Sequence, residues 1–251
     1  MLLNKLTDIV TKLRGPGGCP WDQEQTFKSL KPHIIEESYE LVDAIDQSDM
    51  TLIKEELGDV LLHVVMLSKM AEEFNEFCLA DVIENVCQKM IERHPHVFAN
   101  TSVKNSDEVK KNWELIKQKG KTKSMMSGIA KSLPSLKQAY DIQKKAASVG
   151  FDWPDVKGPL DKIHEEAIEL KKEVQLKSDC IEEEAGDLLF AMVNLYRKLG
   201  LDAEECLRQA NKKFMNRFEK MTAIAKEKKQ IFSDLSLAEK ELLWTECKKN
   251  V

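Results

Sequence analysis

The sequence predicts an all-α protein made of two tandem copies of one helical-bundle unit. Apolar residues recur at helical spacing along most of the chain, and the 251 residues include only ten glycines. A set of acidic, basic and tryptophan residues also appears twice in the same order. The length is sufficient for one large domain or two small ones, so a duplicated unit fits it.

The first half of the chain is expected to hold five helices separated by short breaks. The run Gly15-Pro16-Gly17-Gly18 ends the first helix, and residues 19–22 are expected to form a loop. Pro95 closes the fourth helix because proline cannot continue one. From the apolar periodicity, the helices are predicted at residues 2–14, from about 32 onward, and at 51–74, 79–93 and 109–117.

A linker is predicted between the two copies. Residues 118–127 are rich in Lys, Ser, Thr and Gly and have little apolar pattern. We therefore expect an N-terminal unit at 1–117, a linker at 118–132 and a C-terminal unit at 133–251.

Two helices are predicted between Leu160 and Tyr196, and each carries acidic residues beside an apolar stripe. The first stripe is Leu160, Ile163, Ala167, Leu170 and Val174; the second is Ile181, Ala185, Leu188, Met192 and Leu195. Residues three apart on a helix point in similar directions, so Glu166 and Glu169 form one acidic lane and Glu184 and Asp187 another. If the helices pack antiparallel through their stripes, the two lanes can meet.

Four carboxylates held together repel one another unless a cation compensates their charge. Oxygen ligands suit Mg2+ or Mn2+, so the two lanes together indicate a hard-metal site. The alternative is a pair of solvated acidic faces, because most surface helices carry glutamates at such spacing.

The upstream half repeats this arrangement, which favours the metal site over solvated faces. Glu37, Glu40, Glu56 and Asp59 precede their downstream counterparts by 129 or 128 residues and form a second candidate metal site. The basic and aromatic residues that follow are repeated too: Lys89 and Arg93 correspond to Lys213 and Arg217, and Trp113 to Trp244.

The basic pairs and the tryptophans suggest how an anionic ligand would be held. Lys213 and Arg217 are helix neighbours, so their charges repel unless an anion or an acidic residue lies between them. Phosphate oxygens are the usual partners of Mg2+ and would satisfy both groups. Trp244 is either a base contact or a packing residue. Lys162, four residues before Glu166, is a further phosphate candidate, and His33 takes its place upstream.

Composition argues against several other classes of protein. The formal net charge of −5 argues against stable nucleic-acid binding, and no apolar run is long enough to span a membrane. Six cysteines without a Cys-x-x-Cys pair indicate reduced thiols in a cytoplasmic protein. His94 and His96 flank Pro95 in what is expected to be a turn, with one histidine bonded to a carbonyl. A di-iron bundle needs Glu-x-x-His pairs, and the sequence contains none.

Combined motifs in both halves resemble the MazG family of nucleoside triphosphate pyrophosphohydrolases, a family with the all-α NTP pyrophosphatase fold. The first half contributes Gly18-Cys19-Pro20-Trp21-Asp22, Glu36-Glu37-x-Tyr39-Glu40, Glu55-Glu56-Leu57-Gly58-Asp59 and Arg93-His94-Pro95-His96-Val97-Phe98. The second contributes Val149-Gly150-Phe151-Asp152-Trp153, Glu165-Glu166, Glu183-Glu184-x-Gly186-Asp187 and Ala210-Asn211-x-Lys213-Phe214-x-x-Arg217-Phe218.

The resemblance implies a homodimer that hydrolyses nucleoside triphosphates to monophosphates and pyrophosphate with Mg2+, tolerates many bases and cleans the nucleotide pool. It implies that the C-terminal copy is the main catalytic one. On the matching positions, Glu166, Glu169, Glu184 and Asp187 would be catalytic metal ligands, Lys213 and Arg217 catalytic phosphate contacts, Lys162 a further phosphate contact, and Trp244 a base contact. The alternatives are a non-catalytic helical regulator that binds nucleotide or protein, and a hydrolase specific for dUTP.

Overall fold

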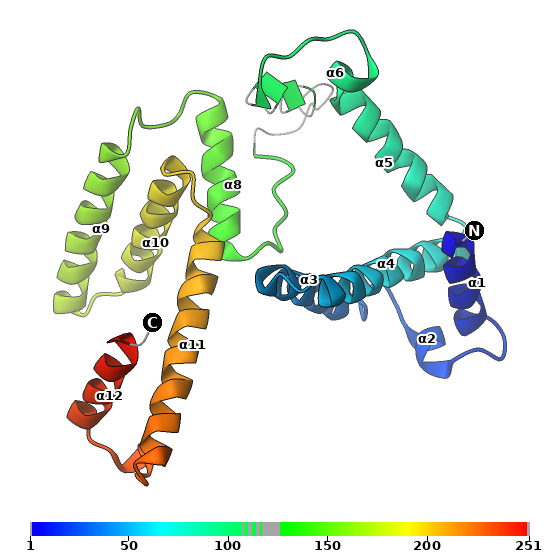
Figure 1. Ribbon diagram of the computed structural model, residues 1–251. Coiled ribbons are helices and arrows are strands. Elements are labelled where there is room, and N and C mark those ends of the chain that lie inside the picture. Colours follow the sequence, from blue (N-terminus) through cyan, green and yellow to red (C-terminus); the bar gives the residue numbers. More distant parts are fainter. Residues whose placement is uncertain (1, 107, 110–111, 114–115, 117–125, 250–251) are drawn as a thin grey trace. The chain divides into compact units, whose positions relative to one another are not determined.

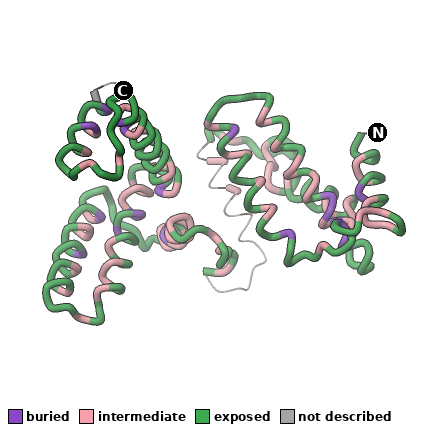
Figure 2. Tube along the Cα trace, turned by 90° about the horizontal axis from the view of Figure 1, so that it is seen from below, coloured by how far each residue is buried: buried purple, intermediate pink, exposed green. Residues whose placement is uncertain are grey.

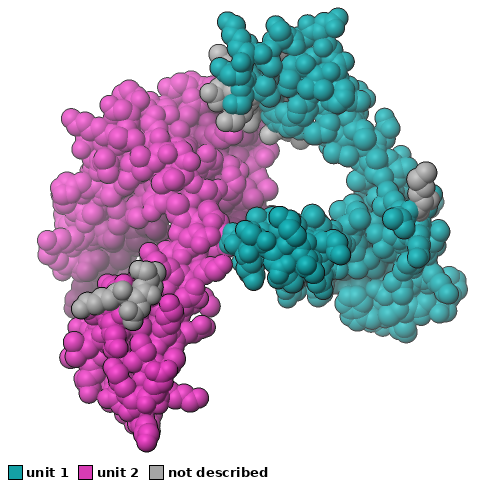
Figure 3. Space-filling model, in the orientation of Figure 1, with its two compact units in different colours: residues 1–121 teal, residues 122–251 magenta. Residues whose placement is uncertain are grey.

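The structure is a computed structural model that describes residues 2–106, 108–109, 112–113, 116 and 126–249. Every element found in these residues is a helix, so the all-α prediction is confirmed. The chain forms two compact units, residues 1–121 and 122–251 (Figure 3). Residues 118–125 of the expected linker lie outside the described residues, as does much of the helix expected at 109–117. None of the described helices is both long and apolar enough to cross a membrane.

The first unit is arranged around one long helix, α4, which packs against α1, α3 and α5 (Figure 1). Its core lies where α1 meets α4, and it consists of Val10, Leu30, Val65, Met66 and Met70. The elements of this unit are α1 (Leu2–Arg14), α2 (Pro20–Glu24), α3 (Lys31–Gln47), α4 (Met50–Glu73), α5 (Leu79–Arg93) and α6 (Pro95–Phe98).

The predicted loop at residues 19–22 is wrong, because Pro20 begins the short helix α2. Proline suits the first position of a helix, where its missing N–H has no partner to lose and its φ is already set. Pro95 begins α6 in the same way, so the expected turn there is a single helical turn. The glycine run does end α1: Gly17 has a φ of +76°, and a Cβ on Gly18 would lie 2.2 Å from the Leu13 carbonyl oxygen.

The second unit pairs α10 with both α9 and α8, and it pairs α11 with α12 (Figure 1). Its core cluster lies between α11 and α12 and consists of Met221, Ala225, Leu243 and Cys247. The elements are α8 (Ser135–Ser148), α9 (Lys157–Leu176), α10 (Ile181–Lys198), α11 (Ala203–Glu227), the 3-10 turn η1 (Phe232–Asp234) and α12 (Leu237–Lys249).

The α9–α10 pair buries less of its apolar surface than the sequence pattern suggests. Ala191 and Val193 are buried, but Leu160 and Val174, which belong to the predicted stripe of α9, are half exposed. Figure 2 shows that exposed positions predominate along the traces of both units. The helices therefore keep apolar side chains that packing within one unit does not use.

Candidate functional site

The carboxylates of the second unit are brought together by the pairing of α9 with α10. Glu166 lies in the middle of α9, and Glu184 and Asp187 lie in the first two turns of α10. One oxygen from each of these three carboxylates lies within 4.8 Å of the others. Glu166 is buried, Glu184 is half-buried and Asp187 is exposed, so the group opens to solvent at one side. The prediction that the two acidic lanes meet is confirmed for these three residues.

Glu169 lies outside this close group but near it. Burial raises the pKa of the Glu184 carboxyl, and the charges of Glu169, Glu166 and Asp187 raise it further. Neighbouring carboxylates disfavour one another's ionised form, and a divalent cation among them would reverse that effect. A group of closely spaced carboxylate oxygens is the donor set that Mg2+ and Mn2+ prefer, so the residues present fit such an ion.

Lys162 supplies the positive charge nearest to Glu166. Its Nζ lies 2.6 Å from Glu166 Oε1 and 2.8 Å from Glu165 Oε1. Hydrogen bonds to Glu165 and Glu166 raise the pKa of Lys162, so the ammonium is charged at neutral pH. The structure thus shows Lys162 as an ion-pair partner of the cluster, and its contact with phosphate stays a prediction. The link to Glu165 was not predicted, although a spacing of three residues on a helix would have suggested it.

The loop before α9 is joined both to the end of α10 and to the start of α9. Asp152 accepts hydrogen bonds from Arg197 and Lys198 at the end of α10, and the bond from Arg197 is the main reason that the pKa of Asp152 is lowered. Trp153 packs so closely on Gly158, at the start of α9, that a Cβ there would lie 2.1 Å from the indole. These residues therefore set where α9 begins relative to α10.

The first unit holds an equivalent group on α3 and α4. One oxygen from each of Glu37, Glu56 and Asp59 lies within 4.8 Å of the others. Burial raises the pKa of Glu56, followed by the charges of Glu40, Asp59 and Glu37 among its neighbours. Glu40 thus lies near this group without belonging to it, as Glu169 does in the second unit. The predicted duplication of the carboxylates is confirmed in the geometry.

The two groups differ in the residue that lies beside the first glutamate. His63 Nε2 on α4 lies 3.8 Å from Glu37 Oε1, a neighbour that the sequence reasoning missed. His33, which takes the place of Lys162, instead lies 3.7 Å from Glu36. A histidine on the neighbouring helix therefore replaces the lysine that precedes the buried glutamate by one turn. Only packing of α3 on α4 brings His63 close, and no local spacing signals it.

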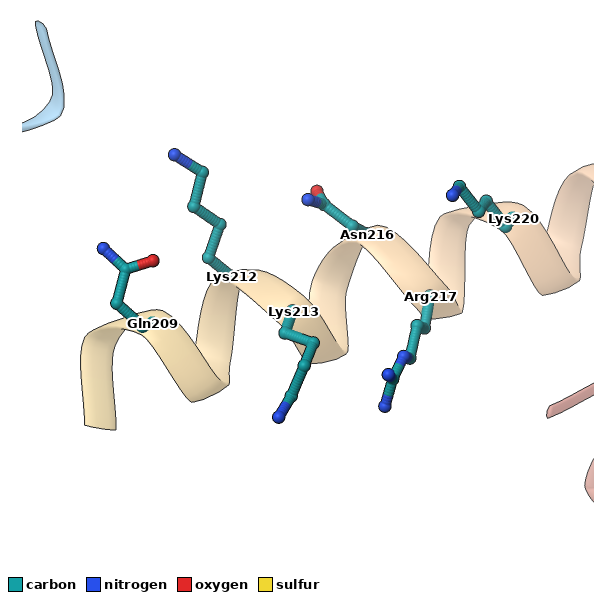
Figure 4. A pocket seen from close by; sticks show the side chains of 6 residues that line it. All are labelled: Gln209, Lys212, Lys213, Asn216, Arg217 and Lys220. Carbon is teal, nitrogen blue, oxygen red and sulfur yellow. The ribbon is translucent and has the colours of Figure 1, made fainter. Parts of the chain in front are cut away.

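Lys213 and Arg217 lie on α11 and line an open hollow of about 310 Å3. Figure 4 shows both side chains on one side of the helix, with Gln209, Lys212, Asn216 and Lys220 directed to the other. Among the residues that the structure describes, neither Lys213 nor Arg217 forms an ion pair with a cluster carboxylate. Their predicted roles in phosphate binding and catalysis therefore remain predictions.

Arg217 packs against Trp244, and this contact is repeated in the first unit. The guanidinium carbon of Arg217 lies 5.7 Å from the centre of the Trp244 ring, and that of Arg93 lies 5.4 Å from Trp113. Lys248 Nζ lies 5.6 Å from the Trp244 ring, and Phe214 packs against it with ring centres 5.3 Å apart. Cationic and aromatic groups thus already contact the indole, and its contact with a base stays a prediction.

The histidines around Pro95 behave as the sequence suggested. His94 Nδ1 lies 2.7 Å from the Met90 carbonyl oxygen, and the His94 ring packs on Trp113. In the described part of the chain, neither His94 nor His96 belongs to a group that could hold a metal ion. All six cysteines are free thiols.

Comparison with known proteins gives both halves the same assignment. The model of the MazG nucleotide pyrophosphohydrolase domain matches residues 25–98 and again residues 157–222. The chain belongs to the MazG nucleotide pyrophosphohydrolase family. Each matched range contains one carboxylate group and one basic pair, whereas Trp113 and Trp244 lie outside the ranges.

Two MazG relatives are similar over nearly their whole length. The nucleoside triphosphate pyrophosphohydrolase/pyrophosphatase MazG of Thermotoga maritima is 44% identical over 251 residues, which cover 99% of this chain and 96% of that protein. The nucleoside triphosphate pyrophosphohydrolase of Escherichia coli K12 is 40% identical over 98% of this chain and 97% of its own length. YabN of Bacillus subtilis is 43% identical, but this chain covers half of it. This MazG member is therefore an enzyme of the nucleotide pyrophosphohydrolase class.

Proposed function

We propose that this MazG protein hydrolyses nucleoside triphosphates to monophosphates and pyrophosphate with Mg2+ bound at a carboxylate cluster. The observation that carries the proposal is the group of three carboxylates within 4.8 Å, present in both units that the family model matches. The names of the Thermotoga and Escherichia relatives support the same reaction. Mn2+ has the same ligand preference and would substitute.

In this proposal Glu166, Glu169, Glu184 and Asp187 would hold the cation, which would neutralise phosphate charge and favour deprotonation of the attacking water. A carboxylate of the cluster accepts the proton of the water that cleaves the bond between the α- and β-phosphates. Lys213 and Arg217 bind phosphate oxygens and stabilise the charge that develops on them. Lys162 holds Glu166 in place at 2.6 Å and extends to the phosphates.

Matched substitutions in the two units test which copy performs the reaction. We expect Glu184→Gln to reduce the rate of pyrophosphate release by about 10²-fold or more, because it removes a ligand at the reacting centre. Glu56→Gln makes the same change in the first unit, and we expect it to reduce the rate less than tenfold. Equal losses would assign the reaction to both copies, and an unaffected Glu184→Gln variant would refute the assignment to the second.

Broad base tolerance and a role in cleaning the nucleotide pool form part of the proposal. The side chains proposed to bind metal and phosphate are carboxylates, lysines and an arginine, which recognise metal and phosphate rather than a base edge. A panel of ribo- and deoxynucleotides with identification of both products tests this. Activity on dUTP alone would favour a narrow hydrolase, and tight Mg2+-dependent nucleotide binding without pyrophosphate would favour a regulator. Six free thiols support a cytoplasmic location.

We also propose a homodimer, because apolar side chains are exposed at equivalent positions in the two copies. Four pairs, separated by 129 or 128 residues, are each between 38% and 55% exposed: Tyr39 and Ile168, Ile45 and Val174, Leu61 and Leu189, Val64 and Met192. These side chains are already about half buried, so burying the rest of one stabilises an interface by about 1 kcal/mol, and a recurrent apolar face favours association.

Light scattering coupled to gel filtration tests the homodimer. The wild-type chain should have twice the monomer mass of 28.7 kDa, and Leu189→Glu should shift it toward the monomer. Leu237→Glu is the matched control, because Leu237 is 74% exposed on α12, away from the repeated positions. A wild-type monomer at micromolar concentration would contradict the proposal.

A further inference from the structure

Glu173 lies in the last turn of α9, one turn beyond Glu169, and its carboxylate is held by a neighbour in the loop. The Ser178 hydroxyl donates a hydrogen bond of 2.5 Å to Glu173 Oε2. The other carboxylate oxygen lies 3.8 Å from Lys172 Nζ, and the Glu173 side chain is only 16% exposed. This glutamate is therefore partly desolvated and oriented, unlike a glutamate on a freely solvated helix face.

The hydrogen bond continues from Ser178 into the start of α10. Ser178 Oγ accepts a bond of 3.2 Å from the Cys180 amide, and the Cys180 carbonyl accepts one of 3.1 Å from the Glu184 amide. Cys180 is the N-cap residue of α10, and its own side chain forms no capping bond. Glu173 is thus connected through Ser178 to the helical turn that carries Glu184.

The corresponding loop of the first unit has the same backbone but different side chains. Ser48 and Lys177 both adopt the left-handed conformation, with φ of 55° and 52°. In the first loop, the Asp49 amide donates a hydrogen bond of 3.3 Å to the Ala44 carbonyl. In the second loop, the Ser178 amide donates one of 3.2 Å to the Glu173 carbonyl. Ala44 is therefore the structural counterpart of Glu173, as Asp49 is of Ser178.

The two loops begin the next helix in different ways. Asp49 caps α4 alone, because its carboxylate accepts hydrogen bonds from the Thr51 and Leu52 amides. In the second unit the neutral Ser178 hydroxyl accepts the hydrogen bond from the Cys180 amide. The negative charge belongs instead to Glu173, which accepts a hydrogen bond from that hydroxyl. In the second unit this negative charge is therefore on α9 rather than in the loop, and it adds to the charges around Glu184.

We propose that Glu173 is a positioning residue of the second carboxylate cluster: it fixes the start of α10 through Ser178, and its negative charge on α9 strengthens cation binding there. The first cluster lacks this residue, because Ala44 occupies its place. The inference rests on the proposed function, since it takes the cluster to be a cation site. It also gives a physical reason for the two clusters to differ in cation affinity.

Direct titration with Mn2+, followed by the electron paramagnetic resonance signal of the free ion, tests the proposal. Glu56→Gln and Asp59→Asn are included in every chain, so that the second cluster dominates binding. Glu173→Gln should weaken Mn2+ binding about three- to tenfold, the scale expected for one charge acting on a nearby dication close to a protein surface. Glu182→Gln, an exposed residue in the first turn of α10, is the matched control and should change it less than twofold.

Hydrolysis gives a second measurement that a general loss of structure would not reproduce. For Glu173→Gln, the Mg2+ concentration for half-maximal pyrophosphate release should rise by the same factor as the Mn2+ dissociation constant. The rate at saturating Mg2+ should fall less than twofold, because the ligands and the basic pair remain.

A double variant separates the effect of the negative charge on α9 from stabilisation of the helix start. Glu173→Ala with Ser178→Asp copies the pair found in the first unit and should melt near the wild-type temperature, because the new carboxylate caps α10. Its Mn2+ binding should remain weak. Recovery of wild-type Mn2+ affinity would overturn the proposal, since Glu173 would then act on the helix start alone.

The outcomes also separate this inference from the proposed function. A chain that releases pyrophosphate and whose Glu173→Gln variant binds Mn2+ normally refutes the inference alone. A chain that binds Mn2+ and loses affinity in Glu173→Gln, yet releases no pyrophosphate from any nucleotide, refutes the function alone. A second cluster that binds no Mn2+ refutes the inference and also the assignment of the reaction to the second unit.

Discussion

Replacing Lys162 with methionine should destabilise the second unit, and Mg2+ should relieve much of the loss. Methionine keeps most of the aliphatic length of the side chain but removes the ammonium, which lies 2.6 Å from a Glu166 oxygen. Glu166 is 4% exposed, so its carboxylate cannot recover the lost interaction from water. A cation bound at the cluster would supply positive charge in place of the ammonium.

The size of the loss follows from the burial of the two partners. Breaking a fully buried pair costs about 3–5 kcal/mol, and breaking an exposed pair costs at most about 1 kcal/mol. The Glu166 side chain is 5% exposed but that of Lys162 is 36% exposed, so we expect about 1–2 kcal/mol. In a unit of this size the melting temperature should fall by about 3–8 °C.

Thermal melts with and without Mg2+ at pH 7.5 measure this effect. The pKa of Lys162 is raised, so its contribution is complete below the ordinary lysine pKa of about 10.4 and is lost only as the pH rises through the raised value. Lys69→Met is the matched control, because Lys69 pairs at 2.9 Å with the half-exposed Glu72. The Lys69→Met substitution should lower the free energy of unfolding by less than about 1 kcal/mol, independently of Mg2+. An equal loss for Lys162→Met with and without Mg2+ would refute a cation at the cluster.

Two further results should follow from particular groups. Burial and the neighbouring carboxylates raise the pKa of Glu184, so the metal-free Glu184→Gln variant should melt above the wild type at neutral pH. The difference in melting temperature between the variant and the wild type should shrink as the pH falls through the raised pKa of Glu184. A difference that stays constant in a pH series would contradict the electrostatic account. Gly18→Ala should lower the free energy of unfolding by at least about 2 kcal/mol in urea titrations, because its Cβ would meet the Leu13 carbonyl. Gly58→Ala places its Cβ in open space within the unit and should lower it far less, and equal effects would refute the steric argument.

The long helices could be predicted from the sequence because their signals are local. The helix expected at 79–93 has those bounds in the structure, and Asp81 lies at its first turn, bonded to the Cys78 amide. The short helix α2 was missed because five residues show no periodicity, and Pro20 reads equally as a turn residue or a first helical residue. Apolar periodicity also did not distinguish side chains buried within a unit from those left exposed on α9.

The repeat made the carboxylate clusters predictable, since both copies place the same residue types at the same helical spacing. Cross-helix neighbours could not be found in this way: His63 meets Glu37 only because α3 packs on α4. Glu173 extends the lane of Glu166 and Glu169 by a further turn, but its tie to Ser178 depends on the left-handed turn at Lys177. Helical spacing thus predicts which residues share one face of a helix, while loops and packing determine which of those side chains are fixed by contacts with neighbours.

Gly58 and Gly186 show that part of the sequence reflects interactions beyond a single unit. Each lies inside a helix, one residue before Asp59 or Asp187, where glycine costs about 1 kcal/mol relative to alanine. A Cβ at either position would meet nothing within 4 Å in the described part of the chain, so packing within the unit does not require glycine. A ligand or a second copy of the chain that approaches the helix backbone there would explain why both clusters have a glycine beside them.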